Sequence, residues 1–139
     1  MDIVTLSKLF YSKYASCNEI LMKENRPYML MLIKINNTTF AIPFRSNIKH
    51  KFVYWTDKNN NCGLDFTKAV VITSLDDIDK TNVQIRQNEF NAIKGDMYKI
   101  EKKFISFLNT YKKAYHRQDI QRNKILILNS ALQYFINYL

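Results

Sequence analysis

Glycine is scarce in this chain: Gly63 and Gly95 are the only two glycines among 139 residues. A phosphate-binding P-loop or a dinucleotide fingerprint needs several glycines, because backbone N–H groups must come close to the phosphates. The sequence therefore excludes both of these nucleotide sites.

Metal ligands are also few. Zinc needs about four N, S or O ligands at workable spacings, and the cysteines and histidines are scattered singly: Cys17, His50, Cys62 and His116. The acidic stretch of Asp76, Asp77 and Asp79 offers the best candidate site for a divalent cation, but an acidic or helix-capping turn is the favoured interpretation. We expect no metal, no cofactor, and two buried, unpaired thiols.

No apolar run reaches the roughly 18–20 residues that span a bilayer. The N-terminus has neither the basic start nor the apolar stretch of a signal peptide, so we expect a cytoplasmic protein. A length of 139 residues with 47% hydrophobic and 14% aromatic residues predicts one packed domain over residues 1–139.

Acidic residues are outnumbered: 21 Lys and Arg stand against 12 Asp and Glu, a net charge of +9. Such an excess favours a polyanionic partner, nucleic acid first and an anionic membrane surface second. A protein that is merely basic and soluble is the alternative. The placement of the charges has to distinguish these two interpretations.

The first half of the chain has the patterns of β-strands. Residues 28–35 form a nearly continuous apolar run, Asn36–Asn37 suits a tight turn, and residues 38–42 return as a second strand of a hairpin. Pro43 is expected to end this strand, because proline cannot donate to a sheet ladder. Further strands are expected at 3–6, 52–56 and 69–73, with a polar loop at 57–63.

In the second half, apolar residues recur every three or four positions. This period predicts a long amphipathic helix from Phe90 to Tyr115, bent near Gly95, and a final helix over residues 120–138. One face of the final helix would comprise Ile125, Leu128, Leu132, Phe135 and Leu139. Strands followed by helices predict an α+β fold, an antiparallel sheet with long C-terminal helices packed around it.

Charge and polarity concentrate where the hairpin ends. In "FAIPFRSNIKHKF", residues 40–52, the apolar run stops and the candidate catalytic residues follow: Arg45, Ser46, Lys49, His50 and Lys51. RNA cleavage without a metal needs a base, an acid and cations that stabilise the phosphorane. His50 can transfer a proton near neutral pH, and the Ser46 hydroxyl can donate to a phosphate oxygen. An ordinary solvent-facing loop is the alternative.

Two stretches, "NRPYMLMLIKINNTTFAIPFRS" (25–46) and "GLDFTKAVVI" (63–72), resemble the ToxN/AbiQ endoribonuclease toxins of type III toxin–antitoxin systems, closest to the TenpN and CptN branches. The resemblance implies a strongly bent antiparallel sheet related to the small-barrel plasmid toxins. It implies metal-independent RNA cleavage that leaves a 2′,3′-cyclic phosphate and a 5′-OH. It also implies inhibition by a small, repeated, folded antitoxin RNA in closed toxin–RNA assemblies that act in phage defence.

The family's Thr-Ser pair after the second hairpin strand falls on Arg45–Ser46, so that Ser46 matches and Arg45 differs. The family lysine that follows corresponds to Lys49 or Lys51, and a lysine that precedes the first hairpin strand corresponds to Arg26. Arginine keeps the charge at that place but presents a planar fork.

Residues 94–124 contain nine Lys and Arg against three acids, an excess that would follow a phosphate backbone along a helix. Aromatic side chains add rings on which unpaired bases stack, and of the neighbours Tyr54 and Trp55 at most one can face RNA. The candidate RNA-binding residues are Arg26, Lys68, Phe44, Trp55, Lys99, Lys102, Lys103, Lys112, Lys113 and Arg117.

The leading hypothesis is therefore a metal-independent endoribonuclease toxin that cleaves mRNA and is inhibited by an antitoxin RNA. The site would lie at the end of the hairpin, supported by Arg26 and Lys68. Two rivals remain: a non-catalytic RNA-binding module with the same surface, and a protein-interaction domain.

Overall fold

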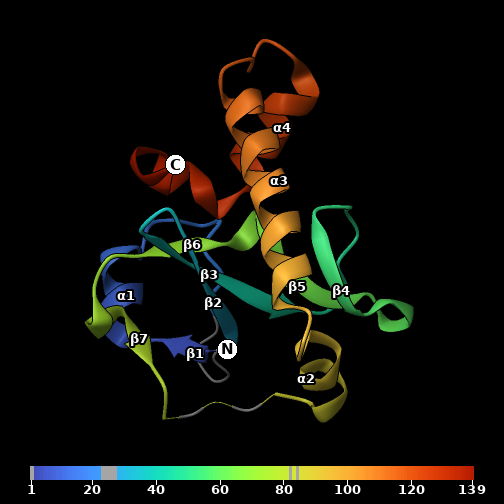
Figure 1. Ribbon diagram of the computed structural model, residues 1–139. Helices are drawn as coiled ribbons and strands as arrows, with labels where there is room; N and C mark the ends of the chain where they lie inside the picture. Colours follow the sequence, from blue (N-terminus) through green and yellow to red (C-terminus); the bar gives the residue numbers. More distant parts are fainter. Residues whose placement is uncertain (1, 23–27, 82, 84) are drawn as a thin grey trace.

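The computed structural model describes residues 2–22, 28–81, 83 and 85–139 (Figure 1). Within these residues the fold is α+β, and the strands are β1 (Ile3–Leu6), β2 (Leu30–Ile35), β3 (Thr38–Arg45), β4 (Val53–Asp57), β5 (Cys62–Asp65), β6 (Val70–Ile72) and β7 (Ile78–Asp79). The α-helices are α1 (Lys8–Lys13), α2 (Gln87–Ile93), α3 (Met97–Tyr115) and α4 (Gln121–Asn129). Four 3₁₀ segments complete the list: η1 (Lys58–Asn60), η2 (Phe66–Lys68), η3 (Leu75–Asp77) and η4 (Ala131–Tyr138).

The described strands form one antiparallel sheet in the order β4-β5-β3-β2-β1-β7, with β6 paired to β3. The sheet is open, since β4 and β7 lie at opposite ends of this order rather than pairing with each other. The predicted α+β class with an antiparallel sheet is confirmed.

The predicted hairpin is also confirmed. Asn36 and Asn37 have φ angles of 48° and 69°, which asparagine tolerates better than most residues. Ile35 pairs with Thr38 across the turn, and the register continues from there to Leu30 opposite Pro43.

The expectation that Pro43 ends the second strand is wrong, because β3 continues to Arg45. Neighbouring residues along an antiparallel strand direct their N–H groups to opposite sides, and the Phe44 N–H donates to the Met29 carbonyl on the β2 side. Pro43 therefore directs its nitrogen to the other side of β3. On that side β6 pairs with β3 as far as Ala41 and β5 begins to pair at Phe44, so Pro43 lies between the two partner strands. A missing N–H interrupts no ladder there.

The predicted loop over 57–63 is too long, because β5 already begins at Cys62. Asn61 makes the turn with a φ of 55°. Gly63 pairs with Trp55 of β4, and a Cβ at this position would collide with the Tyr54 carbonyl oxygen and lie 2.9 Å from Val53 Cγ2. Only glycine allows the two strands to approach this closely.

The long helix predicted from Phe90 to Tyr115 is two helices. Gly95, with a φ of 90°, lies between the end of α2 and the start of α3, so the expected bend is a complete break. The single final helix is also wrong, because Ser130 adopts extended angles and separates α4 from η4. Ile125 and Leu128, expected on one face with Leu132 and Phe135, are each 50% exposed, whereas those two residues are buried.

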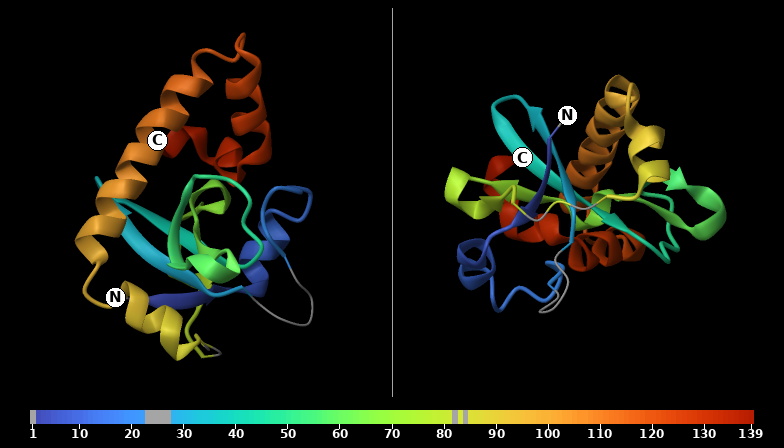
Figure 2. Two further views of the ribbon diagram at one scale, coloured as in Figure 1. Left: turned by 90° about the vertical axis from the view of Figure 1, so that its right-hand side faces the viewer. Right: turned by 90° about the horizontal axis from the view of Figure 1, so that it is seen from below.

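Helices cover both faces of the sheet, with α3 on one face and α1 on the other (Figure 2). On the α3 side, the Phe104 ring lies 5.1 Å from Phe40 and 5.3 Å from Phe66. On the other side, Tyr14 after α1 lies 5.2 Å from Phe135 of η4. A buried phenylalanine contributes about 1.5–3 kcal/mol relative to an exposed one, so these rings fix the helices on the sheet.

The helices α3 and α4 form a hairpin that extends beyond the sheet (Figures 1 and 2). No helix in the described part of the chain has the length and apolar character needed to cross a bilayer.

Candidate functional site

The segment between β3 and β4, residues 46–52, is a basic loop fixed to the fold at its centre. Ile48 is 3% exposed, and its N–H donates to the Asn61 carbonyl at 3.0 Å. Ser46, Lys49 and Lys51 are exposed on either side of this anchor. Because the loop is held by a buried residue, its hydroxyl and cations are presented from a defined position.

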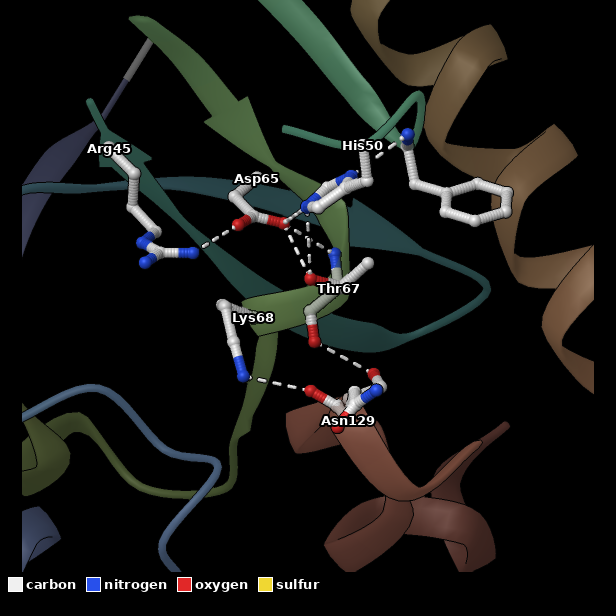
Figure 3. Close-up of polar contacts among 8 residues, drawn as sticks. Arg45, His50, Asp65, Thr67, Lys68 and Asn129 are labelled. Carbon is white, nitrogen blue, oxygen red and sulfur yellow. Dashed lines mark hydrogen bonds and ion pairs between the residues drawn. The ribbon is translucent and has the colours of Figure 1, made fainter. Parts of the chain in front are cut away.

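A fully buried carboxylate, Asp65 at the end of β5, lies behind this loop (Figure 3). Its Oδ2 accepts from Arg45 Nη1 at 2.7 Å, and its Oδ1 lies 3.0 Å from His50 Nε2. Oδ1 also accepts from the Thr67 hydroxyl at 2.6 Å and the Thr67 backbone N–H at 3.0 Å. Four donors thus surround one carboxylate, and two of them come from the predicted site.

The pKa of Asp65 lies below its usual range. Burial acts against ionisation, but the hydrogen bonds from His50, Thr67 and Arg45 favour the carboxylate and outweigh it. Asp65 is therefore ionised at neutral pH and holds the Arg45 guanidinium and the His50 imidazole in place.

The partners of His50 define its tautomer. Nδ1 accepts the Phe52 backbone N–H at 3.1 Å, so it carries a lone pair, and Nε2 must carry the hydrogen donated to Asp65. In this arrangement the ring is neutral and both nitrogens are engaged. His50 thereby fixes the end of the basic loop between Asp65 and Phe52.

Lys68 ends η2 and lies below Asp65 and Arg45 in Figure 3. Its Nζ donates to the Asn129 carbonyl at 2.8 Å, at the C-terminus of α4. Burial and the charge of Arg45 lower the pKa of Lys68, while Asp65 and Glu19 act in the opposite direction. Lys68 therefore connects η2 to the end of α4 beside the Asp65 network.

A small pocket adjoins Lys68. Its wall is largely apolar and is lined by Leu6, Tyr11, Ile20, Leu21, Tyr28, Leu30, Pro43, Lys68 and Val70. The Tyr11 hydroxyl is buried there without a hydrogen-bond partner among the described residues. Burial and the neighbouring Tyr28 raise the pKa of Tyr11 to about 12, so it stays protonated at neutral pH.

The predicted basic helix surface lies on α3, where Lys99, Lys102, Lys103, Lys112 and Lys113 are all exposed. Lys102 lies 4.6 Å from the centre of the Tyr98 ring, and that tyrosine is 69% exposed. Arg117, just beyond the helix, is exposed but paired with Asp119 at 3.0 Å. We call the five lysines the α3 lysine face.

The aromatic candidates are less accessible. Phe44 and Trp55 are half-buried, and Phe44 packs against the core. Tyr54 donates to Asp96 at 2.7 Å; burial and this hydrogen bond raise its pKa to about 12. The structure thus brings Arg45, His50 and Lys68 together around Asp65, while Arg26 lies outside the described residues.

Sequence reasoning missed Asp65, Thr67, Asn129 and Ser130. An acid in an apolar run, followed two residues later by threonine, is typical of a carboxylate that caps the next turn, and this signal could have identified Asp65. The Ser130 hydroxyl donates to the Thr67 carbonyl at 2.8 Å and accepts the Leu132 N–H, so it begins η4 and fixes η2. No local pattern indicates that pairing.

The acidic stretch forms a turn, as the sequence favoured, but a serine and not an aspartate caps its 3₁₀ segment. Ser74 caps η3, Asp77 is buried and paired with Lys13 at 2.6 Å, and Asp79 accepts from Thr81. Within the described ranges no three His, Cys, Asp or Glu residues cluster as metal ligands would. Both cysteines are free thiols, Cys62 buried and Cys17 half-buried.

No family model, curated protein or solved structure matches the chain. Its function therefore has to be inferred from its own residues.

Proposed function

We propose that the protein is an RNA-binding endoribonuclease. The observation that supports this best is the exposed basic loop at the end of β3, backed by an ionised, fully buried Asp65 that orients Arg45 and His50. More particularly, we propose a toxin of a type III toxin–antitoxin system, of the TenpN/CptN kind that the stretches 25–46 and 63–72 resemble. A relation to the small-barrel plasmid toxins, and action on mRNA in the cytoplasm, belong to the same proposal.

Arg45 and four residues of the loop have a part in the proposed reaction. Arg45, Lys49 and Lys51 stabilise the negative charge that grows on the phosphorane, and Ser46 donates a hydrogen bond to one of its oxygens. Attack by the ribose 2′-OH then leaves a 2′,3′-cyclic phosphate and a 5′-OH, without any metal. His50 orients the loop; for proton transfer its ring would first have to leave the Phe52 N–H.

The proposed inhibitor is a small, repeated, folded antitoxin RNA in a closed assembly with several toxin copies. The α3 lysine face supports this part of the proposal, because exposed lysines spaced along a helix can neutralise successive phosphates. The RNA would run from the basic loop across α3.

RNA cleavage by the purified protein tests the proposal. Total RNA is incubated with the protein with and without EDTA, and the ends of the fragments are identified chemically. We expect 2′,3′-cyclic phosphate ends in both reactions. Ser46→Ala should cleave about 10²–10³-fold more slowly, because one transition-state hydrogen bond is lost, while Ser12→Ala, an exposed site on α1, should cleave at the parental rate.

A non-catalytic RNA-binding module is the second candidate, and the engaged ring nitrogens of His50 favour it. This module would bind RNA with a strong salt dependence but leave it intact. A parent protein that neither binds nor cleaves RNA would contradict both candidates and leave a protein-interaction domain.

A further inference from the structure

The proposed cleavage needs a group that removes the proton from the 2′-OH, and the neutral His50 ring has no free nitrogen for it. We propose that Lys68 is this general base, a catalytic residue whose amine receives the 2′-OH proton. The inference rests on the proposed endoribonuclease function and goes beyond it by assigning the proton transfer.

Lys68 lies in the right place for this role. It follows directly after Thr67, which binds Asp65, and the charges of Asp65 and Arg45 both act on its amine, so the amine lies near the arginine that would bind phosphate. Pro43 and Arg45 are two residues apart on β3 and therefore point to the same face of the strand. Since Pro43 lines the pocket beside Lys68, that pocket and the guanidinium lie on one side of β3.

The hydrogen bonds of Lys68 suit a base better than a structural ion pair. Its amine donates to a neutral carbonyl, that of Asn129, and no described carboxylate lies within salt-bridge distance of it. A neutral amine can keep this bond and still offer its lone pair to a substrate hydroxyl.

The charged groups around Lys68 shift its pKa in opposite directions. Asp65 and Glu19 favour the ammonium form, as do the carbonyl groups at the end of α4, whereas Arg45 disfavours it. Tyr11 of α1 and Tyr28, two residues before β2, also line the pocket, and Tyr11 stays protonated at neutral pH. The apolar wall leaves Lys68 half-buried, and its lowered pKa means that burial and Arg45 prevail, so more free amine exists at neutral pH than for an exposed lysine.

The Lys68 amine takes the 2′-OH proton, and the 2′-oxygen forms a bond to phosphorus. The bond from phosphorus to the 5′-oxygen breaks, its electron pair goes to that oxygen, and the oxygen takes up a proton from solvent. Lys68 then returns its proton to solvent.

Two substitutions separate the amine's proton transfer from its charge. Lys68→Arg keeps a cation but cannot release a proton in this range, and Lys68→Gln keeps a donor for the Asn129 carbonyl without charge. Lys34, an exposed lysine of β2, provides the matched controls Lys34→Arg and Lys34→Gln. Single-turnover cleavage of a short RNA is measured for all five proteins as a function of pH, with RNA affinity and thermal melting beside it.

We expect the parental rate to rise with pH as Lys68 loses its proton. Lys68→Arg should bind RNA as the parent does, cleave about 10²–10⁴-fold more slowly and lose this rise, and Lys68→Gln should show the same loss if the arginine variant fails to fold. Both Lys34 variants should keep the parental profile.

Parental rate and pH profile in a folded Lys68→Arg protein would overturn the assignment of the base while leaving the endoribonuclease proposal intact. Absence of cleavage by the parent itself would instead refute the proposed function, and the assignment with it.

Discussion

Asp65 is a carboxylate with no exposed surface, and such a group is tolerated in a protein interior only when donors surround it. Arg45, His50 and Thr67 supply these donors from three different segments of the chain. The position of the basic loop therefore depends on the charge state of a residue that has no exposed surface.

Replacement of Asp65 by asparagine should destabilise the folded protein. The amide presents an N–H₂ where the carboxylate accepted bonds, so at least one of Arg45, His50 and Thr67 loses its partner. We expect the free energy of unfolding at pH 7 to fall by about 3–5 kcal/mol. Urea unfolding measures this, and Asp119→Asn at an exposed ion pair is the matched control that should change it little.

The same variant should alter the pH dependence. Because the pKa of Asp65 is lower in the folded protein than the value of about 3.9 for an unperturbed Asp, its stabilisation is present above that value and is lost as the pH falls through the folded pKa. The stability gap between parent and Asp65→Asn should therefore narrow in acid. A gap that stays constant down to the acid unfolding of the parent would show that the charge of Asp65 is not what stabilises the site.

At the scale of elements, the sequence predicted those helices and turns that depend on residues close together in the chain. Two asparagines with positive φ made the β2–β3 hairpin predictable, and a period of three to four residues located the body of α3. The extension of β3 past Pro43 and the strand β5 were not predictable in this way, because each depends on a partner strand distant in sequence. Likewise the break at Ser130 reflects a bond to Thr67, 63 residues away.

The two glycines give a test at this scale. Gly63→Ala should lower the free energy of unfolding by about 1–3 kcal/mol, because a Cβ cannot be accommodated between β4 and β5 unless the backbone moves. Gly95→Ala meets no atom within 4 Å, so its cost should come from the φ of 90° alone. Urea midpoints of both variants measure the costs. We expect Gly63→Ala to reduce RNA cleavage as well, since β5 ends at Asp65, whereas Gly95→Ala should leave the cleavage rate near the parental value.

For the whole molecule, the cations behind the net charge of +9 differ in their surroundings: some are exposed and others are ion-paired. The α3 lysine face is exposed on one helix, while Arg45 and Lys13 are each ion-paired with a buried carboxylate. The sequence predicted the members of the basic loop, since they are neighbours in the chain. It could not indicate Asp65 behind them, because that contact exists only in the folded sheet.

Removal of charge from the α3 lysine face should change RNA binding in a defined way. A variant with Lys102, Lys103, Lys112 and Lys113 changed to Gln should lose about 0.7–0.9 unit of the log–log salt slope for each phosphate contact removed. The matched control changes four exposed lysines elsewhere, namely Lys8, Lys34, Lys58 and Lys80. Equal slopes for the two quadruple variants would show that the RNA does not lie along α3.

The hydrogen bond between Ser130 and the Thr67 carbonyl has a consequence for folding during translation. It links residues 63 positions apart, and at about 5–20 residues per second the ribosome needs roughly 3–13 s to make the intervening chain. During that interval the nascent polypeptide already contains the basic loop and Asp65, but η2 has neither Ser130 nor Asn129 to hold it. The two hydrogen bonds that hold η2 therefore form late in translation, and a chain cut short before Asn129 would contain the basic loop and Asp65 but lack the partners that fix η2.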